Sequence, residues 1–168
     1  MPDIDRPLGR VRAAVADLVA AAERAGAAWT TPRAPGKWSP SQVVEHVARI
    51  MEESANVASG RPSKFPTIPF FLRPIIRVLV FKRTLWRKDF PKMKAIDAFV
   101  PVAGSATPAE GRVRLQGALT AFDRACRARA ASGQNVASTI FGAVHVADFA
   151  RFQELHVRHH IMQMPGTA

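Results

Sequence analysis

Apolar residues recur every three or four positions along four stretches of this chain, which is the period of one face of an α-helix. The stretches are residues 7–25, 40–59, 109–131 and 148–164. The stripe of the first stretch consists of Leu8, Val11, Val15, Leu18, Val19 and Ala22. Charged residues mostly lie off this stripe, so the pattern predicts amphipathic helices that each bury one face.

Helix-breaking and capping residues mark the ends of these stretches. Gly26 follows the first, a loop with two prolines and a glycine occupies residues 29–38, and Gly133 ends the third. Residues 39–42, Ser-Pro-Ser-Gln, have the pattern of a capping box with proline at the first helical position. Residues 138–145 are predicted to form a turn before the last helix.

Residues 61–108 lack this regularity, because seven prolines lie between positions 62 and 108. The apolar run 70–81 is too short to span a bilayer, which needs about 18 residues. It is expected to be a partly buried helix, with a membrane-surface or partner-binding segment as the alternative. Four helices with this insert between the second and third predict one all-α domain over residues 1–168, a four-helix bundle.

Most of the net charge of +11 falls in one segment. Residues 61–94 hold ten Lys and Arg residues against one acid, Asp89, and so carry +9. A local basic patch can attract phosphate, an acidic partner or an anionic bilayer. No helix-turn-helix spacing or base-reading motif accompanies the charge, so no specific nucleic-acid partner is expected.

The cysteine content and the N-terminal residues bear on the compartment. The single cysteine, Cys126, lies on the apolar stripe of the third helix, where it is expected to pack in the core. The lack of a cysteine pair fits a reducing compartment. Asp3, Asp5 and Arg6 stand where a signal peptide would have a basic start and an apolar core. A cytoplasmic protein is therefore expected.

Four of the five histidines lie within 16 residues near the C-terminus. His156 and His160 are four apart on one helix, so their imidazoles can point at the same place. The only histidine outside this stretch is His46, in the second helix, and a catalytic-type metal site needs such a third ligand. His156 with His159 is the alternative pair, and His145 is expected to cap the last helix or hydrogen bond at its start. A shared metal site is the preferred interpretation, because burying several unpartnered imidazoles is costly.

A divalent ion held by three imidazoles can lower the pKa of a bound water to about 7 or hold a thiol as thiolate. Zinc, nickel and iron(II) all accept imidazole, so the ligands do not select the metal. Candidates for a general base are sought at Gln42, Glu45, Glu53 and Glu154. Only Glu53 is both a base and on the face of His46, seven residues further along the helix.

Three motifs resemble those of the DinB/YfiT-like superfamily. They are the Trp-Ser-Pro segment that ends at His46, the Phe-Gly-x-x-His turn at 141–145, and the His-x-x-His-His-x-x-Gln sequence at 156–163. The Pro-rich insert followed by residues 97–101 resembles more closely a branch of this superfamily that has no known function. The resemblance covers nearly the whole chain.

This resemblance implies a four-helix bundle of up-down-down-up type with a divalent metal held by His46, His156 and His160. It also implies a homodimer in many cases, and the apolar 70–81 run would suit a buried interface. Members with known activity are thiol-dependent transferases or metal-dependent hydrolases.

Two functional hypotheses follow. The first is a metal-dependent enzyme for a small-molecule substrate, either a transferase that uses a low-molecular-weight thiol or a hydrolase. In this hypothesis Gln42, His159 and Gln163 lie next to the metal ligands and orient them. The second is a non-catalytic bundle whose basic apolar segment, residues 61–94, docks on a partner or membrane surface. Loss of His160 would abolish the first function, and neutralisation of the basic segment would abolish the second.

Overall fold

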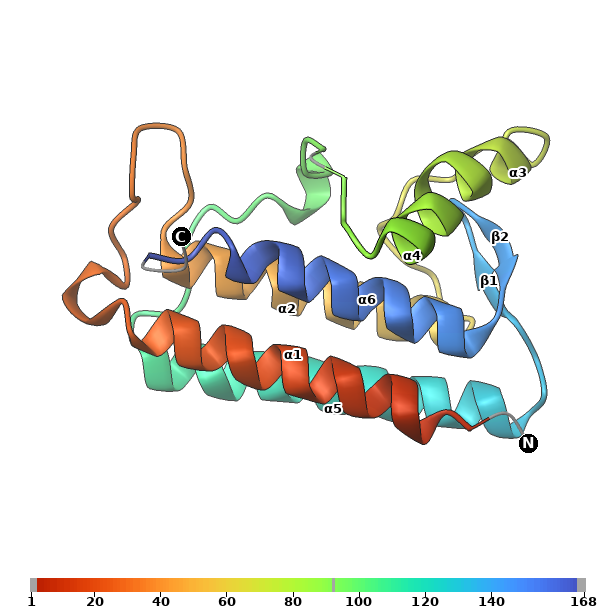
Figure 1. Ribbon diagram of the computed structural model, residues 1–168, viewed down its shortest axis with the longest axis horizontal. Helices are drawn as coiled ribbons and strands as arrows, with labels where there is room; N and C mark the ends of the chain where they lie inside the picture. Colours follow the sequence, from red (N-terminus) through yellow and green to blue (C-terminus); the bar gives the residue numbers. More distant parts are fainter. Residues whose placement is uncertain (1–2, 92, 166–168) are drawn as a thin grey trace.

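The computed structural model describes residues 3–91 and 93–165 and is mostly helical, with one small sheet. Its long helices are α1 (Asp5–Glu23), α2 (Pro40–Ala58), α5 (Pro108–Ala131) and α6 (Val146–Ile161). They lie side by side, with α1 and α6 running in one direction and α2 and α5 in the other (Figure 1). Each overlaps one predicted stretch, so the mainly helical class is confirmed.

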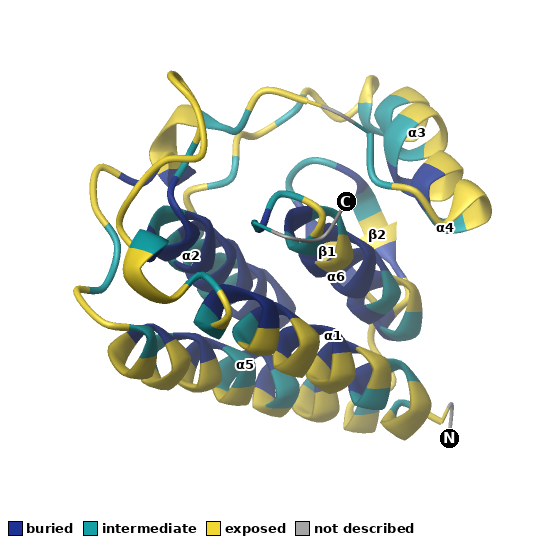
Figure 2. Ribbon diagram, turned by 60° about the vertical axis from the view of Figure 1, so that its left-hand side comes forward, coloured by how far each residue is buried: buried dark blue, intermediate teal, exposed yellow. Residues whose placement is uncertain are grey.

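The core lies between these four helices, where their apolar stripes meet (Figure 2). Leu8 and Leu18 of α1 and Leu115 and Phe122 of α5 are completely buried. Full burial of one such side chain stabilises the fold by about 1.5–3 kcal/mol. Cys126 is also buried, as its place on the stripe predicts.

The start of α2 is held by the predicted capping box. The Oγ of Ser39 accepts a hydrogen bond from the backbone N–H of Gln42, and the Oε1 of Gln42 accepts one from the backbone N–H of Ser39. The Nε2 of Gln42 also donates to the carbonyl oxygens of Pro101 and Val102, at 3.4 and 3.3 Å. Gln42 therefore joins the end of the insert to the first turn of α2. A short 3₁₀ turn, η1 (Gly26–Ala28), precedes this region.

A small hairpin precedes α6. Strands β1 (Val136–Ser138) and β2 (Gly142–Val144) pair antiparallel, with Ala137 opposite Ala143. The sequence pattern predicted only a turn at 138–145 in an all-α fold, so the strands are a correction. Three-residue strands are too short to show the alternation that indicates a strand.

A glycine and a serine stabilise the loop of this hairpin. Gly142 has a φ of +73°, a conformation that glycine adopts without a steric penalty. The Oγ of Ser138 accepts hydrogen bonds from the backbone N–H groups of Ile140 and Phe141, at 3.2 and 3.1 Å. The loop therefore satisfies its own donors while it reverses the chain.

The insert is irregular, as predicted, but holds a short helical segment above the long helices (Figure 1). The segment consists of α3 (Arg73–Ile76), a π-helical stretch (Arg77–Lys82) and α4 (Arg83–Arg87). It ends at Lys88, which has a φ of 55°. A 3₁₀ turn, η3 (Asp97–Phe99), follows. Within the described residues, no helix is both long and apolar enough to cross a bilayer.

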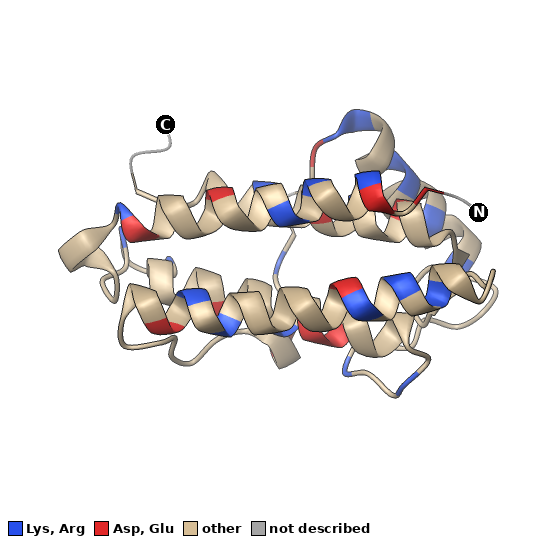
Figure 3. Cartoon of the chain, turned by 90° about the horizontal axis from the view of Figure 1, so that it is seen from below, with Lys and Arg blue, Asp and Glu red and all other residues tan. Residues whose placement is uncertain are grey.

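Charges on the long helices are mixed, with basic residues beside acidic ones (Figure 3). The pairs that join two long helices include Arg12 with Asp123, Arg112 with Glu23, Arg127 with Asp5, and Arg114 with Glu45 and Glu52. Within the described part of segment 61–94, the one ion pair links Lys94 to Asp97 at 3.5 Å. Lys92, which counts toward the charge of that segment, lies outside the described residues.

Candidate metal centre

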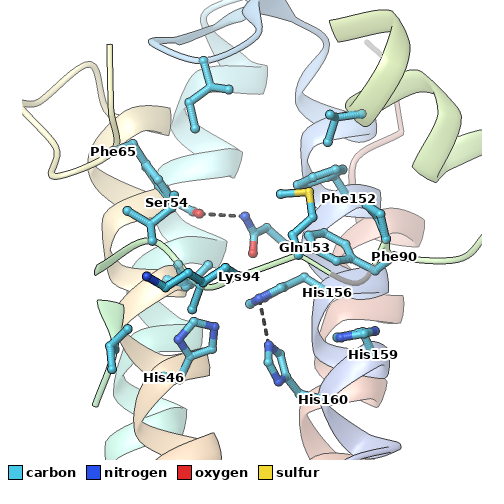
Figure 4. Close-up of a pocket in the computed structure, with 18 of the residues that line it drawn as sticks. His46, Ser54, Phe65, Phe90, Lys94, Phe152, Gln153, His156, His159 and His160 are labelled. Carbon is cyan, nitrogen blue, oxygen red and sulfur yellow. Dashed lines mark hydrogen bonds between the residues drawn. The ribbon is translucent and has the colours of Figure 1, made fainter. Parts of the chain in front are cut away.

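Three histidines from two helices meet in a buried group at the wall of one cavity (Figure 4). His46 comes from α2, and His156 and His160 come from α6. Their side chains are 4%, 6% and 5% exposed, and one nitrogen from each ring lies within 4.8 Å of the other two. The structure therefore brings together the three residues predicted as ligands, while His159 lies outside the group.

The spacing of these nitrogen atoms is close to that of a site for a single ion. The Nε2 atoms of His156 and His160 lie 3.1 Å apart. Two nitrogen ligands bound tetrahedrally to zinc at about 2.0–2.1 Å lie roughly 3.4 Å from each other. The widest separation in the group, 4.8 Å, exceeds the roughly 4.2 Å that two such bonds can span, so an ion would draw the rings slightly together.

Hydrogen bonds orient two of the three rings. The Nδ1 of His46 lies 2.9 Å from the carbonyl oxygen of Phe99, and the Nδ1 of His160 lies 3.0 Å from the Oε1 of Gln163. Both oxygens can only accept, so each Nδ1 carries the hydrogen and each Nε2 carries a lone pair that can bind a metal. In this structure the Nε2 of His160 accepts a hydrogen bond from the Nε2 of His156. Metal-ligating histidines are typically held by such a bond on the other ring nitrogen.

Burial keeps these imidazoles neutral. It lowers the pKa of His46, lowers that of His160 to about 3, and lowers that of His156 well below its ordinary value. The neighbouring histidines lower the pKa of His156 and His160 further, because two protonated rings at this distance would repel each other. All three rings are thus uncharged near pH 7, the form that binds a metal ion.

The cavity beside the histidines has a volume of about 1070 Å³. Its walls are mainly apolar, and its lining includes the cations Arg33, Lys37 and Lys94 but no acidic residue from the described part of the chain. The Nδ1 of His156 is buried and makes no hydrogen bond to any described residue. A buried polar atom left unsatisfied costs about 1–3 kcal/mol, so a partner for this atom would stabilise the site.

A second unsatisfied atom belongs to Gln153, which is 4% exposed and lies one helical turn before His156 on α6. Its Nε2 donates a hydrogen bond to the Oγ of Ser54 at 2.7 Å, and its Oε1 is buried without a partner among the described residues. Figure 4 shows this oxygen beside the histidine group. The amide is therefore held by α2 and offers an acceptor to a ligand.

The carboxylates proposed as bases lie elsewhere. Glu53 accepts hydrogen bonds from the side chain of Asn56 and from the backbone N–H of Lys64, and it lines a separate, smaller pocket. Glu45 pairs with basic side chains of α2 and α5, and Glu154 pairs with basic side chains of α6. None of the three lines the histidine cavity.

Of the three residues expected to orient the metal ligands, two lie beside the histidine group and one does not. Gln163 contacts both neighbouring histidines, since its Oε1 lies against His160 and its Nε2 lies 3.3 Å from the Nε2 of His159. His159 lines the cavity, with its ring centroid 5.4 Å from that of His160. Gln42 instead binds backbone at 101–102, two residues beyond the Phe99 carbonyl that holds His46.

His145 occupies the N-cap position of α6, but its side chain makes no capping hydrogen bond. Its backbone carbonyl oxygen accepts from the N–H of Phe149 at 2.9 Å. The expected capping role of the imidazole is therefore wrong, and the helix begins without a side-chain cap.

Sequence reasoning missed Gln153, Ser54 and Trp38 as site residues. Gln153 could have been found as a polar residue three positions before His156, on a face that is otherwise apolar. Ser54 lies eight positions after His46, on the same side of α2. Trp38 packs its ring 4.7 Å from that of His46, and its place at the start of the Trp-Ser-Pro segment that ends at His46 could have indicated this contact.

The fold and the site define a mainly helical protein with a buried three-histidine group that can hold a metal ion. The sequence profile of the family described as "Protein of unknown function (DUF1569)" matches residues 10–166, so the chain belongs to this family. Neither a curated protein nor a solved structure matches the chain.

Proposed function

We propose that the protein is a metal-dependent enzyme related to the DinB-like superfamily, with its long helices forming an up-down-down-up four-helix bundle. His46, His156 and His160 would hold zinc, nickel or iron(II). The observation that carries this proposal is the histidine geometry: three buried nitrogen atoms within 4.8 Å of one another, in rings whose pKa values are lowered. Buried polar atoms normally have a partner, and a single ion would serve as the partner of all three rings.

The reaction we propose is a small-molecule transfer that uses a low-molecular-weight thiol, or a hydrolysis. The ion, when bound, would supply Lewis acidity and lower the pKa of a water or thiol that it binds. An external thiol is needed for the transfer, because burial raises the pKa of Cys126 to about 12 and its side chain is fully buried. The protein's own thiol is therefore unsuited to the reaction.

The residues of the cavity would bind and orient the substrate. The apolar walls favour a largely apolar molecule and exclude water, and Arg33, Lys37 and Lys94 attract an anionic group. The Oε1 of Gln153 would accept a hydrogen bond from the substrate. His159 lines the same cavity and is better placed for a role in general acid–base catalysis than Glu53, which lines another pocket.

The first test is metal content, measured by elemental analysis of untagged protein purified without a chelator. The parent should carry about one equivalent of a divalent metal, as expected for a single three-histidine site. The double variant His46→Ala, His160→Ala should carry none and keep its helical circular dichroism. The matched control is His145→Ala, which removes a histidine outside the group and should leave the metal content unchanged.

The proposal would be contradicted by a parent that holds no metal and takes up none when zinc, nickel or iron(II) is added. Metal in the double variant at the parent's level would also contradict it. With the metal identified, thiol-transfer and hydrolysis assays on small anionic apolar substrates follow, and Gln153→Leu should raise KM more than it lowers kcat.

A further inference from the structure

Residues 70–88, which comprise the helical segment of the insert and the residues next to its ends, have an outer face that is both apolar and basic. Its exposed apolar residues are Phe70, Phe71, Leu72, Ile75, Val78, Leu79 and Trp86. Its exposed basic residues are Lys82, Arg83, Arg87 and Lys88. Phe70 and Trp86 are 79% and 81% exposed, and a cluster of large apolar side chains in water marks an interaction surface.

The opposite face of the same segment is packed on the protein. Phe81 is buried, and its ring lies 5.0 Å from that of Phe152. Ile76 and Val80 line the histidine cavity, and the Nη1 of Arg77 donates to a carbonyl oxygen of β2 at 3.1 Å. The inner face of the segment is therefore packed against the protein, and the outer face remains exposed.

The burial of the segment defines its outer side. Phe81 and Thr84 are buried, whereas the exposed residues are Ile75, Val78, Leu79, Lys82, Arg83 and Trp86. Apolar side chains occupy its first half, and cations with one tryptophan occupy its second half. Helices that lie in a membrane interface also combine large apolar side chains with Lys and Arg.

Charge decides which partner fits this face. A second copy of the chain docked through it would bring two strongly basic segments together, and like charges in contact disfavour association. An anionic lipid surface instead attracts the cations and accepts the apolar side chains. We propose that the outer face of residues 70–88 binds the surface of an anionic bilayer, with the chain lying on the membrane.

Vesicle sedimentation tests this binding. The parent should sediment with vesicles of phosphatidylcholine mixed with phosphatidylglycerol and should stay in solution with phosphatidylcholine alone. Added salt should weaken the binding, because it screens the attraction. Trp86 is a built-in reporter, and its fluorescence should shift to shorter wavelength on the anionic vesicles and not in a Trp86→Phe variant.

Two pairs of variants separate this face from the rest of the surface. The triple variant Lys82→Gln, Arg83→Gln, Arg87→Gln should bind anionic vesicles roughly a hundredfold less tightly, since each cation at such a surface strengthens binding roughly fivefold. Its control removes the same charge from α1 and α5, as Arg6→Gln, Arg10→Gln, Arg124→Gln. Leu79→Ser should also weaken binding, and Val113→Ser, at an exposed position on α5, should not.

Three results would overturn the proposal. The first is equal loss of binding in the triple variant and its control, which would indicate attraction to overall charge only. The second is no binding of the parent to anionic vesicles. The third is a parent that sediments as a dimer, without lipid, that Leu79→Ser dissociates, since this face would then be a contact between two copies of the chain.

Discussion

At the scale of single residues, the site depends on side chains that hold the histidines. One amide, that of Gln163, accepts from His160 and contacts His159 as well. The backbone carbonyl oxygen of Phe99, far away in the chain, accepts a hydrogen bond from His46. These contacts set which nitrogen of each ring carries the hydrogen and therefore which nitrogen could bind a metal ion.

Replacing Gln163 by Leu removes the acceptor for the Nδ1 hydrogen of His160 while keeping a side chain of similar size. We expect metal affinity to fall by about 10–100-fold, the usual cost of losing such a partner. Competition with a chromogenic chelator measures it, and Gln116→Leu on the exposed side of α5 is the control. Unchanged affinity in the Gln163 variant would show that the amide does not position the ring.

Cys126 should be inert in the folded protein. Burial raises the pKa of its thiol to about 12, with a smaller contribution from the charge of Asp123. The thiolate is the reactive form, so a thiol reagent at mildly alkaline pH should label the folded protein far more slowly than protein unfolded in guanidinium. Mass spectrometry at timed intervals follows the labelling, and equal rates in the two states would contradict the buried position.

At the scale of elements, the end of the insert and the start of α2 are built against each other. Gln42 binds the backbone at 101–102, and Gly104 packs against the backbone of Ser41 so closely that a Cβ there would collide with its carbonyl group. The Nε1 of Trp29 donates to the carbonyl oxygen of Ser105 at 2.8 Å. These contacts hold the loop that carries Phe99 over the helix that carries His46.

Gly104→Ala should therefore destabilise the protein by about 1–3 kcal/mol, the usual cost of inserting a group into a packed site. Urea unfolding followed by circular dichroism gives the change. Gly117→Ala on α5 is the matched control, because a Cβ there meets open space, and it should stabilise the helix by about 0.5–1 kcal/mol. Similar midpoints for the two variants would mean that the loop is not held against α2.

At the scale of the whole molecule, burial of the histidines links stability to pH. The unfolded chain takes up protons on these rings below the ordinary histidine pKa of 6.5, whereas the folded protein resists until a much lower pH, about 3 for His160. The unfolded state thus binds more protons in this range, and the folded state loses stability as pH falls. Glu154 affects stability at a lower pH. Burial by itself raises the pKa of its carboxyl group, but Arg151 and Arg158 outweigh burial and lower this pKa. The stability that the charged carboxylate contributes is therefore lost only below pH 4.5.

Between pH 6.5 and about 5, the free energy of unfolding of metal-free protein should fall by up to about 1.4 kcal/mol per pH unit for each buried histidine. The variant His160→Gln should show a shallower slope by about one such contribution. Urea titrations at several pH values measure both. Identical slopes for the parent and the variant would contradict a neutral, buried His160.

The four helical stretches and the close approach of His156 to His160 follow from the sequence by itself, because both depend on the 3.6-residue period of one helix. Cys126 in the core follows from the same period. The meeting of His46 with this pair agrees with the sequence-based prediction, but its distances come only from the packing of α2 near α6.

Only the tertiary structure decided the rest. The support of His46 by Phe99, the placement of Glu53 in another pocket, and the acceptor offered by Gln153 all depend on segments far apart in the chain. The insert shows the same limit. Its apolar run predicts burial, yet a short helical segment can bury only one of its faces. The elements on which the segment packs determine which face is exposed. Local periodicity determines elements, and contacts between elements determine the site and the exposed surface.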